Sequence, residues 1–264
     1  MAGTSLTIHE LGAMKRDGEK IAMLTCYDAT FARAMDRAGV DIVLVGDSLG
    51  MVVQGRSSTV GVDLADICYH VTCVERGLER TFLLADMPFG SYHDEATAMS
   101  SAVRLMGAGA AMVKLEGAGP MIDVVDYLTD RGVAVCGHLG LTPQSVHQLG
   151  GFKVQAREEV AAGKLLQDAR ALEAAGAQML VVECVPSAVG RQVSTTLDIP
   201  VIGIGAGSGC DGQVLVMHDM LGLGDGLPKF VEDFMAGAAT VQRAFESFVL
   251  AVREGRFPGP EHEY

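Results

Sequence analysis

A short pattern that occurs three times along the chain constrains the fold more than any other feature. The sequence reads Ala-Gly-Val-Asp-Ile-Val at residues 38–43, Ala-Gly-Ala-Ala-Met-Val at 108–113 and Ala-Gly-Ala-Gln-Met-Leu at 175–180. In each copy a helical stretch ends at a glycine, the residue that most often ends helices, and an apolar strand-like run follows at once. This arrangement is typical of a helix that returns the chain to a parallel strand, so the sequence predicts an α/β fold.

Short apolar runs alternate with helical stretches over the whole length. The predicted strands cover residues 21–27, 41–47, 81–86, 111–117, 133–138, 179–185, 199–205 and 213–218. The predicted helices cover residues 7–15, 29–38, 63–79, 94–106, 121–131, 158–175, 186–196 and 230–252. A chain of 264 residues with 49% hydrophobic side chains suits a barrel built as one domain. We therefore expect a single (β/α)8 TIM barrel over residues 1–264, with an N-terminal helical cap and an extra C-terminal helix.

Composition and charge argue against several classes of protein. The formal net charge of −13 argues against nucleic acid, because a phosphate backbone needs a basic surface. The six cysteines are scattered and form no C-x-x-C pair, which favours a reducing, cytosolic protein over a disulfide scaffold. No apolar run approaches the roughly 20 residues of a membrane span. Residues Met1–His9 lack a basic region followed by an apolar core, so we also expect no signal peptide.

Ionisable residues gather at the carboxyl ends of the predicted strands, where α/β barrels place their sites. These residues are Asp28, Asp47, Asp86, Glu116, His138, Glu183 and Asp219. Strands covered by helices should be almost wholly apolar, so charges there need pairing, a metal or a function. Helix N-caps and rim salt bridges explain a single such residue, Asp28 or Asp219 for example, equally well. For the whole set, we expect an active site at one mouth of the barrel.

Three of these carboxylates are candidate metal ligands. A carboxylate cluster without a cysteine or histidine ligand pattern favours a hard cation, and magnesium typically uses one or two direct carboxylates and keeps waters. We expect Asp47 and Asp86 near the metal, with Glu116 in support. Strand alternation suggests that Asp47 shares a face with Val43 and Val45. A substrate such as a 2-oxo acid could chelate this cation through two oxygens.

Lys114 lies two residues before Glu116, so the two side chains should point to the same face. It could hold a substrate carboxylate or stabilise an enolate, or it could simply pair with Glu116 or another carboxylate. Glu183 lies in an apolar setting, where desolvation should make it a stronger base, suited to removing a proton from carbon. A buried, hydrogen-bonded structural glutamate is the alternative.

The remaining signals are more ambiguous. His138 could hydrogen-bond an enolate or carboxylate oxygen, or serve as a structural histidine, and Ser48 could donate to a ligand carboxylate. Residues 49–62 are polar and unpatterned, which indicates a mobile active-site loop. Residues 203–207 resemble a phosphate-binding loop, but Ser208 breaks the glycine pattern, so close backbone packing at the barrel mouth is the better interpretation.

Several segments along the chain together resemble the ketopantoate hydroxymethyltransferase family. The resemblance extends over nearly the whole chain. Its segments are Leu44–Met51, Leu84–Pro88, Val113–Gly117, Cys136–Gln144, Gly150–Gln155, Glu183–Pro186, Ile199–Ala206, Met217–Asp219 and Phe257–Gly259.

The resemblance implies a particular reaction and a set of roles. Members transfer a hydroxymethyl group from 5,10-methylenetetrahydrofolate to 3-methyl-2-oxobutanoate, giving 2-dehydropantoate for pantothenate and coenzyme A synthesis. By resemblance, Asp47, Asp86 and Glu116 form a Mg2+ site, and Glu183 is the proton acceptor. The oxo acid contacts Asp47, Ser48, Asp86 and Lys114, and we add His138 as a further contact. The resemblance also implies a cytoplasmic homo-oligomer, typically a decamer.

Two other classes stay open on the residues alone. A magnesium-dependent lyase or mutase of the phosphoenolpyruvate mutase and isocitrate lyase type would share the barrel and the acidic mouth. Isocitrate lyases carry Lys-Lys-Cys-Gly-His on a loop, whereas Cys136-Gly-His138 lacks the lysines and lies in a predicted strand. A non-catalytic binding barrel is not expected to keep Lys114, Glu116 and Glu183 together.

Overall fold

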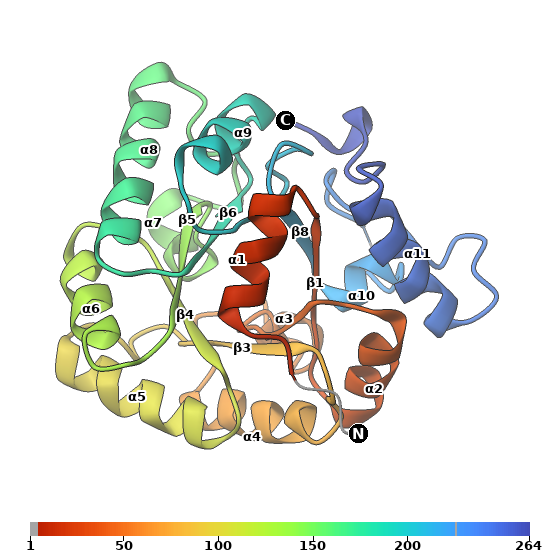
Figure 1. The fold of residues 1–264 in the computed structure, drawn as a ribbon, viewed down its shortest axis with the longest axis horizontal. Coiled ribbons are helices and arrows are strands. Elements are labelled where there is room, and N and C mark those ends of the chain that lie inside the picture. The colour runs from red at the N-terminus through yellow and green to blue at the C-terminus, as the bar shows by residue number, and fades with distance from the viewer. Residues whose placement is uncertain (1–4, 225) are drawn as a thin grey trace.

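Eight parallel strands form a closed barrel in the order of the chain (Figure 1). The computed structural model describes residues 5–224 and 226–264. The signal-peptide prediction falls partly on residues 1–4, outside the described residues. The strands are β1 (Ile21–Thr25), β2 (Ile42–Val45), β3 (Phe82–Asp86), β4 (Met112–Glu116), β5 (Val135–Gly140), β6 (Met179–Glu183), β7 (Val201–Ile204) and β8 (Gly212–Leu215). Because β8 pairs with β1, the described barrel has no free sheet edge, and the predicted TIM barrel is confirmed.

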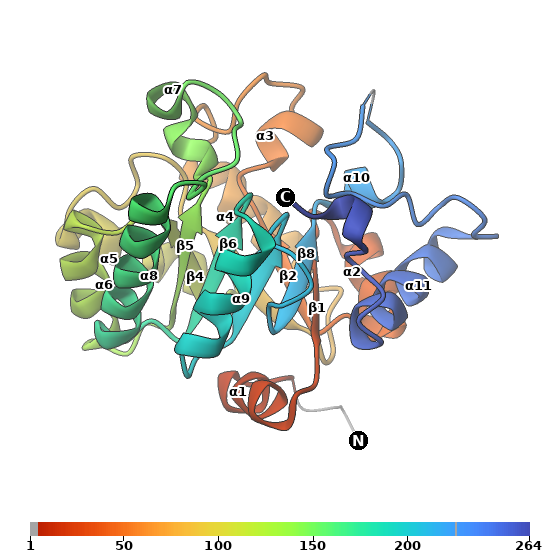
Figure 2. The ribbon, with the colours of Figure 1, turned by 90° about the horizontal axis from the view of Figure 1, so that it is seen from above.

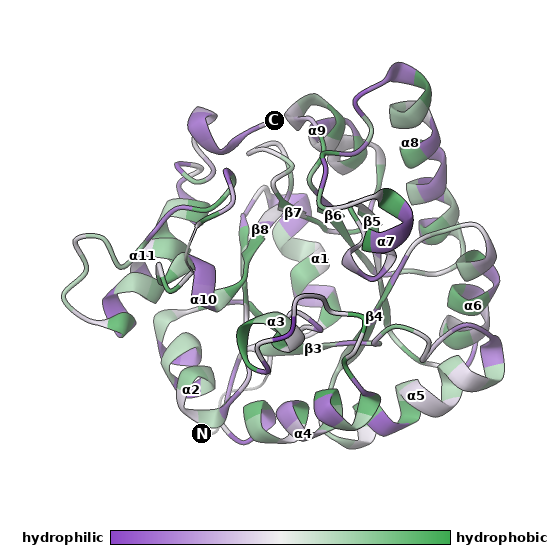
Figure 3. Cartoon of the chain, turned by 180° about the vertical axis from the view of Figure 1, so that it is seen from behind, coloured by the Kyte–Doolittle hydropathy of each residue, from purple (hydrophilic) through white to green (hydrophobic). Residues whose placement is uncertain are grey.

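Helices surround the strands, and short helices lie over one end. They are α1 (Ile8–Asp17), α2 (Ala29–Ala38), α3 (Leu49–Val52), α4 (Leu64–Glu75), α5 (Glu95–Gly107), α6 (Pro120–Thr129), α7 (Val146–Leu149), α8 (Glu159–Ala174), α9 (Ser187–Thr196), α10 (Met217–Met220) and α11 (Val241–Arg253). The helices carry both apolar and polar residues (Figure 3), and their buried apolar side chains join the layer outside the strands. No helix in the described part of the chain is long and apolar enough to cross a membrane.

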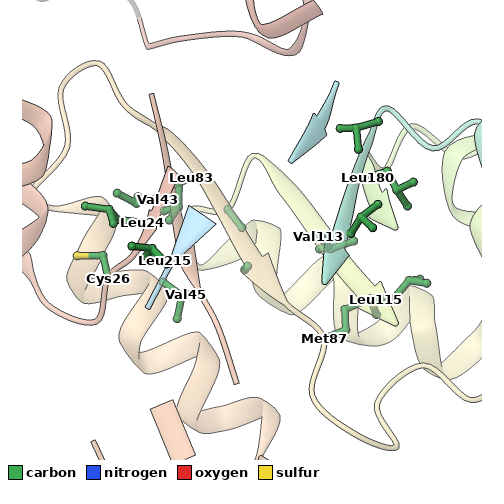
Figure 4. Close-up of a cluster of buried hydrophobic side chains, with 14 of the residues drawn as sticks. Leu24, Cys26, Val43, Val45, Leu83, Met87, Val113, Leu115, Leu180 and Leu215 are labelled. Atoms are coloured by element: carbon green, nitrogen blue, oxygen red, sulfur yellow. The ribbon is translucent and has the colours of Figure 1, made fainter. Parts of the chain in front are cut away.

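The strands separate two apolar layers. Alternate residues point outward and pack under the helices, as Leu24, Val43 and Val113 do (Figure 4). The other residues, such as Ile42 and Leu84, fill the inside of the barrel. The inside of the barrel is therefore a packed core and not an open channel.

Helix α1 closes the amino-terminal end of the barrel, as the predicted cap requires (Figure 2). Its buried Leu11 joins the apolar cluster inside the strands. The helix begins with the predicted capping box, in which Thr7 and Glu10 each bond to the other's backbone N–H. Helices α3, α7 and α10 lie at the opposite end, where the strands finish (Figure 2).

The predicted C-terminal helix exists but begins eleven residues late. The span Phe230–Val252 was predicted as one helix, whereas α11 starts only after Thr240, whose Oγ1 accepts the Arg243 N–H. The Asp233 carboxylate bonds the backbone of the next residues, and Gly237 has φ 85°, so this stretch makes turns. Phe234 still packs edge-on against a phenylalanine of α11. The helical spacing of the apolar residues before Thr240 therefore reflects packing against their neighbours and not a helix.

The eighth strand is shorter than predicted. Residues 213–218 were expected to be extended, but β8 ends at Leu215. The Met217 N–H donates to Thr25 Oγ1 at 2.9 Å, and the Val216 carbonyl accepts the N–H of Asp219. The chain therefore turns into α10 immediately, and Asp219 lies on a short helix at the mouth.

Candidate active site

A cavity of about 410 Å3 opens at the carboxyl ends of the strands, and Met51 of α3 and Asp219 of α10 contribute to its wall. All seven residues predicted for metal, substrate or proton transfer line it. They are Asp47, Ser48, Asp86, Lys114, Glu116, His138 and Glu183. These side chains, which come from separate strand ends, therefore lie at one mouth of the barrel, while their roles stay predictions.

The parallel register brings the inward residues of neighbouring strands together. Asp86 on β3 pairs in register with Lys114 on β4, and Glu116 on β4 pairs with His138 on β5. Lys114 and Glu116 follow the interior residue Met112 at intervals of two, so they share the inner face, as predicted. Strand alternation therefore explains why these four polar groups are neighbours.

Asp47 reaches the cavity by a different route from the one predicted. Val43 and Val45 belong to the outer layer under the helices, so Asp47 does not share their side of a strand. Strand β2 ends at Val45, and the turn that follows reorients the chain. The Asp47 N–H donates to Asp86 Oδ2 at 3.1 Å, which fixes the turn against β3. Ser48 starts α3, and its hydroxyl shares a 2.8 Å hydrogen bond with Tyr27.

Lys114 is the central charge of the site. It is 3% exposed, and its Nζ lies 2.5 Å from Asp86 Oδ1. Burial alone would lower the pKa of Lys114, but Asp86, Glu116 and Asp47 outweigh it and hold the pKa above its usual range. Burial, with Asp86 and Glu116 nearby, raises the pKa of Asp47 to about 8. Lys114 therefore stays charged, and the carboxylates around it compete for its single positive charge.

His138 joins two carboxylates. Its Nδ1 lies 3.3 Å from Glu116 Oε1, and its Nε2 lies 3.2 Å from Glu183 Oε2. Burial and Lys114 oppose the charged imidazolium, but hydrogen bonding to the two glutamates outweighs them and raises the pKa of His138 to about 9. Although burial opposes it, His138 in turn holds the pKa of Glu116 below its usual range. His138 is therefore a charged partner of both glutamates.

Glu183 ends β6 in a less apolar setting than predicted. Its side chain keeps 14% of its surface exposed to the cavity and faces His138. The next residue, Cys184, has the left-handed φ of 47°, which is a strained conformation for a side chain with a Cβ. At Gly140, where φ is 91°, a Cβ would overlap the carbonyl oxygen of Glu183. A tight backbone contact between the ends of β5 and β6 therefore sets the position of Glu183.

Two buried residues of the site escaped sequence reasoning. The Gln144 amide donates to Asp47 Oδ2 at 2.9 Å and to the Met87 carbonyl at 3.0 Å, and its Oε1 accepts the Tyr92 hydroxyl. The Gln144 N–H donates to Glu116 Oε2 at 3.0 Å, and Tyr92 accepts the Glu116 N–H. Gln144 thus holds two carboxylates from different strands. It lies in a single 3-10 turn, Pro143–Ser145, too short to show periodicity, and the only available signal was its place in the resembling segment 136–144.

The structure places Asp28 outside the cavity and Asp219 in its wall. The Asp28 carboxylate accepts the N–H groups of Thr30 and Phe31, so it is an N-cap of α2, the alternative left open above. Asp219 lines the cavity, and burial raises its pKa.

The segment 49–62 contains α3 and contributes Met51 and Thr59 to the cavity wall. Its mobility stays a prediction.

The carboxylates do not form a compact preformed metal centre. Among residues 5–224 and 226–264, no group of three histidine, cysteine or acidic side chains is arranged to hold a metal ion. Buried oxygens are nevertheless available. Asp86 Oδ1 and Glu116 Oε1 contact Lys114 and His138 but accept no regular hydrogen bond within the described chain. This donor set fits magnesium, which uses few direct carboxylates and retains waters.

The fold and the site define a (β/α)8 barrel enzyme with a charged pocket for a small polar substrate. The sequence model of the ketopantoate hydroxymethyltransferase family matches residues 5–260, and the chain belongs to this family. A 3-methyl-2-oxobutanoate hydroxymethyltransferase of Burkholderia ambifaria is 55% identical over 261 residues, 98% of this chain and 96% of the relative. The enzyme of that name from Thiobacillus denitrificans is 55% identical over 260 residues, covering 98% and 99%.

Solved structures share the fold at much lower identity. A phosphoenolpyruvate phosphomutase from Streptomyces platensis superposes with a TM-score of 0.62 at 15% identity, covering 95% of this chain and 88% of that one. A phosphonopyruvate hydrolase gives 0.62 at 11% identity, covering 80% and 81%. At such identities the likeness shows the barrel architecture alone. Because the barrel is shared, the fold alone does not distinguish a hydroxymethyltransferase from a mutase or lyase.

We predict that Gly140→Ala destabilises the protein by about 2 to 5 kcal/mol, because it adds a Cβ at a positive φ against the Glu183 backbone. Urea unfolding measures the change. Gly163→Ala is the matched control, since Gly163 is exposed within α8 and a Cβ there meets nothing within 4 Å. That control should gain roughly 0.5 to 1 kcal/mol. Equal stability of the two variants would contradict the packing described.

Gln144→Ala should cost about 1 to 3 kcal/mol of unfolding free energy, because a buried carboxylate and a buried carbonyl lose their donor. The family's reaction should slow as well, since Asp47 would no longer be held. Gln155→Ala is the control, because Gln155 lies in the same connection between β5 and α8 and, among the described residues, its side chain bonds the Lys153 carbonyl alone, at 2.9 Å. It should change stability by no more than about 0.5 kcal/mol. Indistinguishable variants would refute the positioning role of Gln144.

Proposed function

We propose that the protein transfers a hydroxymethyl group from 5,10-methylenetetrahydrofolate to 3-methyl-2-oxobutanoate, forming 2-dehydropantoate. Water supplies the hydroxyl oxygen and tetrahydrofolate leaves, so the atoms balance. Family membership supports the reaction. The observation that carries the mechanism is the placement of Glu183 at the same cavity as Lys114, with His138 between the charged groups.

The residues suggest how the oxo acid is activated. Among the clustered carboxylates Asp47, Asp86, Glu116 and Glu183, Glu183 keeps the most exposed edge, so it is the base that removes the C3 proton. The electrons then move to the oxo oxygen, and the ammonium of Lys114 stabilises the resulting enolate. His138 stays charged between Glu116 and Glu183 and orients both. Ser48 contributes a hydroxyl at the cavity wall that can donate to the substrate carboxylate.

We further propose that Mg2+ binds beside Asp47 and Asp86, with Glu116 in support. The four clustered carboxylates Asp47, Asp86, Glu116 and Glu183 lie beside two cations, Lys114 and His138, so a dication would balance their charge when all four are ionised. Asp86 Oδ1 and Glu116 Oε1, which accept no regular hydrogen bond, support the same assignment. When bound, magnesium would polarise the oxo group of the substrate as a Lewis acid.

Three further predictions, on domain organisation, assembly and cellular compartment, follow from the family resemblance. We infer that residues 1–264 act as one catalytic domain and that the protein is a cytoplasmic homo-oligomer, a decamer by the resemblance. The cofactor, the folate donor, the subunit number and the compartment stay predictions.

Replacing the base tests the mechanism. We expect Glu183→Gln to bind 3-methyl-2-oxobutanoate normally and to lose about 100- to 10,000-fold in turnover, because an amide cannot take the C3 proton. The measurement is the formation of 2-dehydropantoate in the presence of Mg2+ and methylenetetrahydrofolate.

Glu158→Gln supplies the control, since Glu158 is exposed and its side chain makes no capping hydrogen bond. It removes the same charge and should keep full turnover. A Glu183→Gln variant with near-normal turnover would rule out Glu183 as the base.

A further inference from the structure

The cavity has two chemically different halves. The polar residues described above come from β2 to β6, a continuous arc of the closed barrel. The remaining arc, over β7, β8 and the segment after them, is apolar. It contributes Ile204, Val214, Val216, Pro228, Phe230 and Tyr264.

The apolar half is built as a fixed wall. Gly205 lets the Phe230 and Tyr264 rings approach the end of β7, because a Cβ there would lie 3.0 and 3.2 Å from them. The Tyr264 carbonyl accepts the Ser187 N–H at 3.1 Å, and Lys229 Nζ lies 5.3 Å from the Tyr264 ring centroid. Two aromatic rings are therefore held at the cavity, where a flat ring could pack on them.

One charged group interrupts this apolar half. Asp219 lies on α10, directly after β8, and β8 is diametrically opposite β4 with its Lys114 in the closed barrel. Its half-buried carboxylate has no hydrogen-bond or ion-pair partner among the described residues. By contrast, the carboxylates of Asp28, which caps α2, and Asp233, in the turns before α11, accept backbone hydrogen bonds. Asp219 is thus free to accept hydrogen bonds from a ligand.

The cavity also has more room than the oxo acid needs. Its volume of about 410 Å3 lies in the range that accommodates drug-sized ligands, whereas 3-methyl-2-oxobutanoate has only five carbons. The polar half suffices for such a small acid. The second substrate therefore needs to fit an apolar wall that carries a single carboxylate.

We propose that the apolar half binds the pterin ring of the folate co-substrate and that Asp219 accepts the two N–H groups of its 2-amino-4-oxopyrimidine edge. That edge presents a ring N–H and an amino N–H side by side, and a carboxylate accepts such a pair through both oxygens. The ring faces pack against Phe230 and Tyr264. This inference rests on the proposed function, which supplies the folate.

The test is the affinity for tetrahydrofolate, measured anaerobically by calorimetry. Asp219→Asn keeps the shape but sets an amide donor against the ligand's donors, so its Kd for tetrahydrofolate should rise on the order of 10- to 100-fold. The Kd for 3-methyl-2-oxobutanoate with Mg2+ should stay within about twofold. Glu232→Gln is the control, because it removes a nearby charge that does not line the cavity. Its folate affinity should be unchanged.

A ligand change tests the same contact without relying on a variant. A tetrahydrofolate analogue with methyl in place of the 2-amino group should bind the unmodified protein more weakly. On Asp219→Asn it should lose less affinity than tetrahydrofolate loses, because only the ring N–H of the pair remains to bond the carboxylate. Equal losses in both proteins, or unchanged folate affinity in Asp219→Asn, would overturn the inference while hydroxymethyl transfer persists. Failure of the unmodified protein to bind tetrahydrofolate or form 2-dehydropantoate would instead overturn the proposed function.

Discussion

The burial of Lys114 among carboxylates is the interaction on which the rest of the site depends. A buried ammonium is tolerated only when it is paired, and removing one member of a buried pair typically costs about 3 to 5 kcal/mol. Lys114 meets Asp86 from the neighbouring strand, and Glu116 on its own strand and Asp47 after β2 supply further negative charge. Adjacent parallel strands bring these carboxylates together around Lys114, so the closed barrel is what allows the charge to be buried.

The other features of the site follow from that constraint. One lysine cannot neutralise Asp47, Asp86 and Glu116 together, and the remaining negative charge is distributed over fixed donors. Gln144 donates to two of these carboxylates, and the protonated His138 faces Glu116 and Glu183. The excess of acidic groups is also the reason to expect a dication. The polar network occupies one arc of the barrel and leaves the opposite arc apolar for a second ligand.

Sequence reasoning succeeded where regular structure sets the geometry. The glycine turns predicted the parallel α/β fold, and the two-residue spacing of Lys114 and Glu116 placed both inside the barrel because they lie within β4. Asp47 was expected in the cavity for the wrong reason, since β2 ends before it and alternation no longer applies. The start of α11 was missed because apolar residues at helical spacing also pack from turns.

The contacts that sequence could not predict depend on irregular backbone. Gln144 lies on a loop after β5, and nothing in its neighbours indicates that its amide bridges Asp47 and the Met87 carbonyl. Asp28 and Asp219 each follow a predicted strand, but one caps α2 and the other faces the cavity. Only the path of the chain after each strand separates these outcomes.

The central claim is that this charged arc removes the C3 proton of 3-methyl-2-oxobutanoate. Proton NMR of this acid in D2O tests it, with the protein and either Mg2+ or excess chelator, and with and without tetrahydrofolate. The account predicts loss of the C3 proton signal with magnesium and its persistence with chelator, and formation of 2-dehydropantoate when methylenetetrahydrofolate is added. Persistence of the signal in every magnesium mixture, with no 2-dehydropantoate formed, would contradict the account.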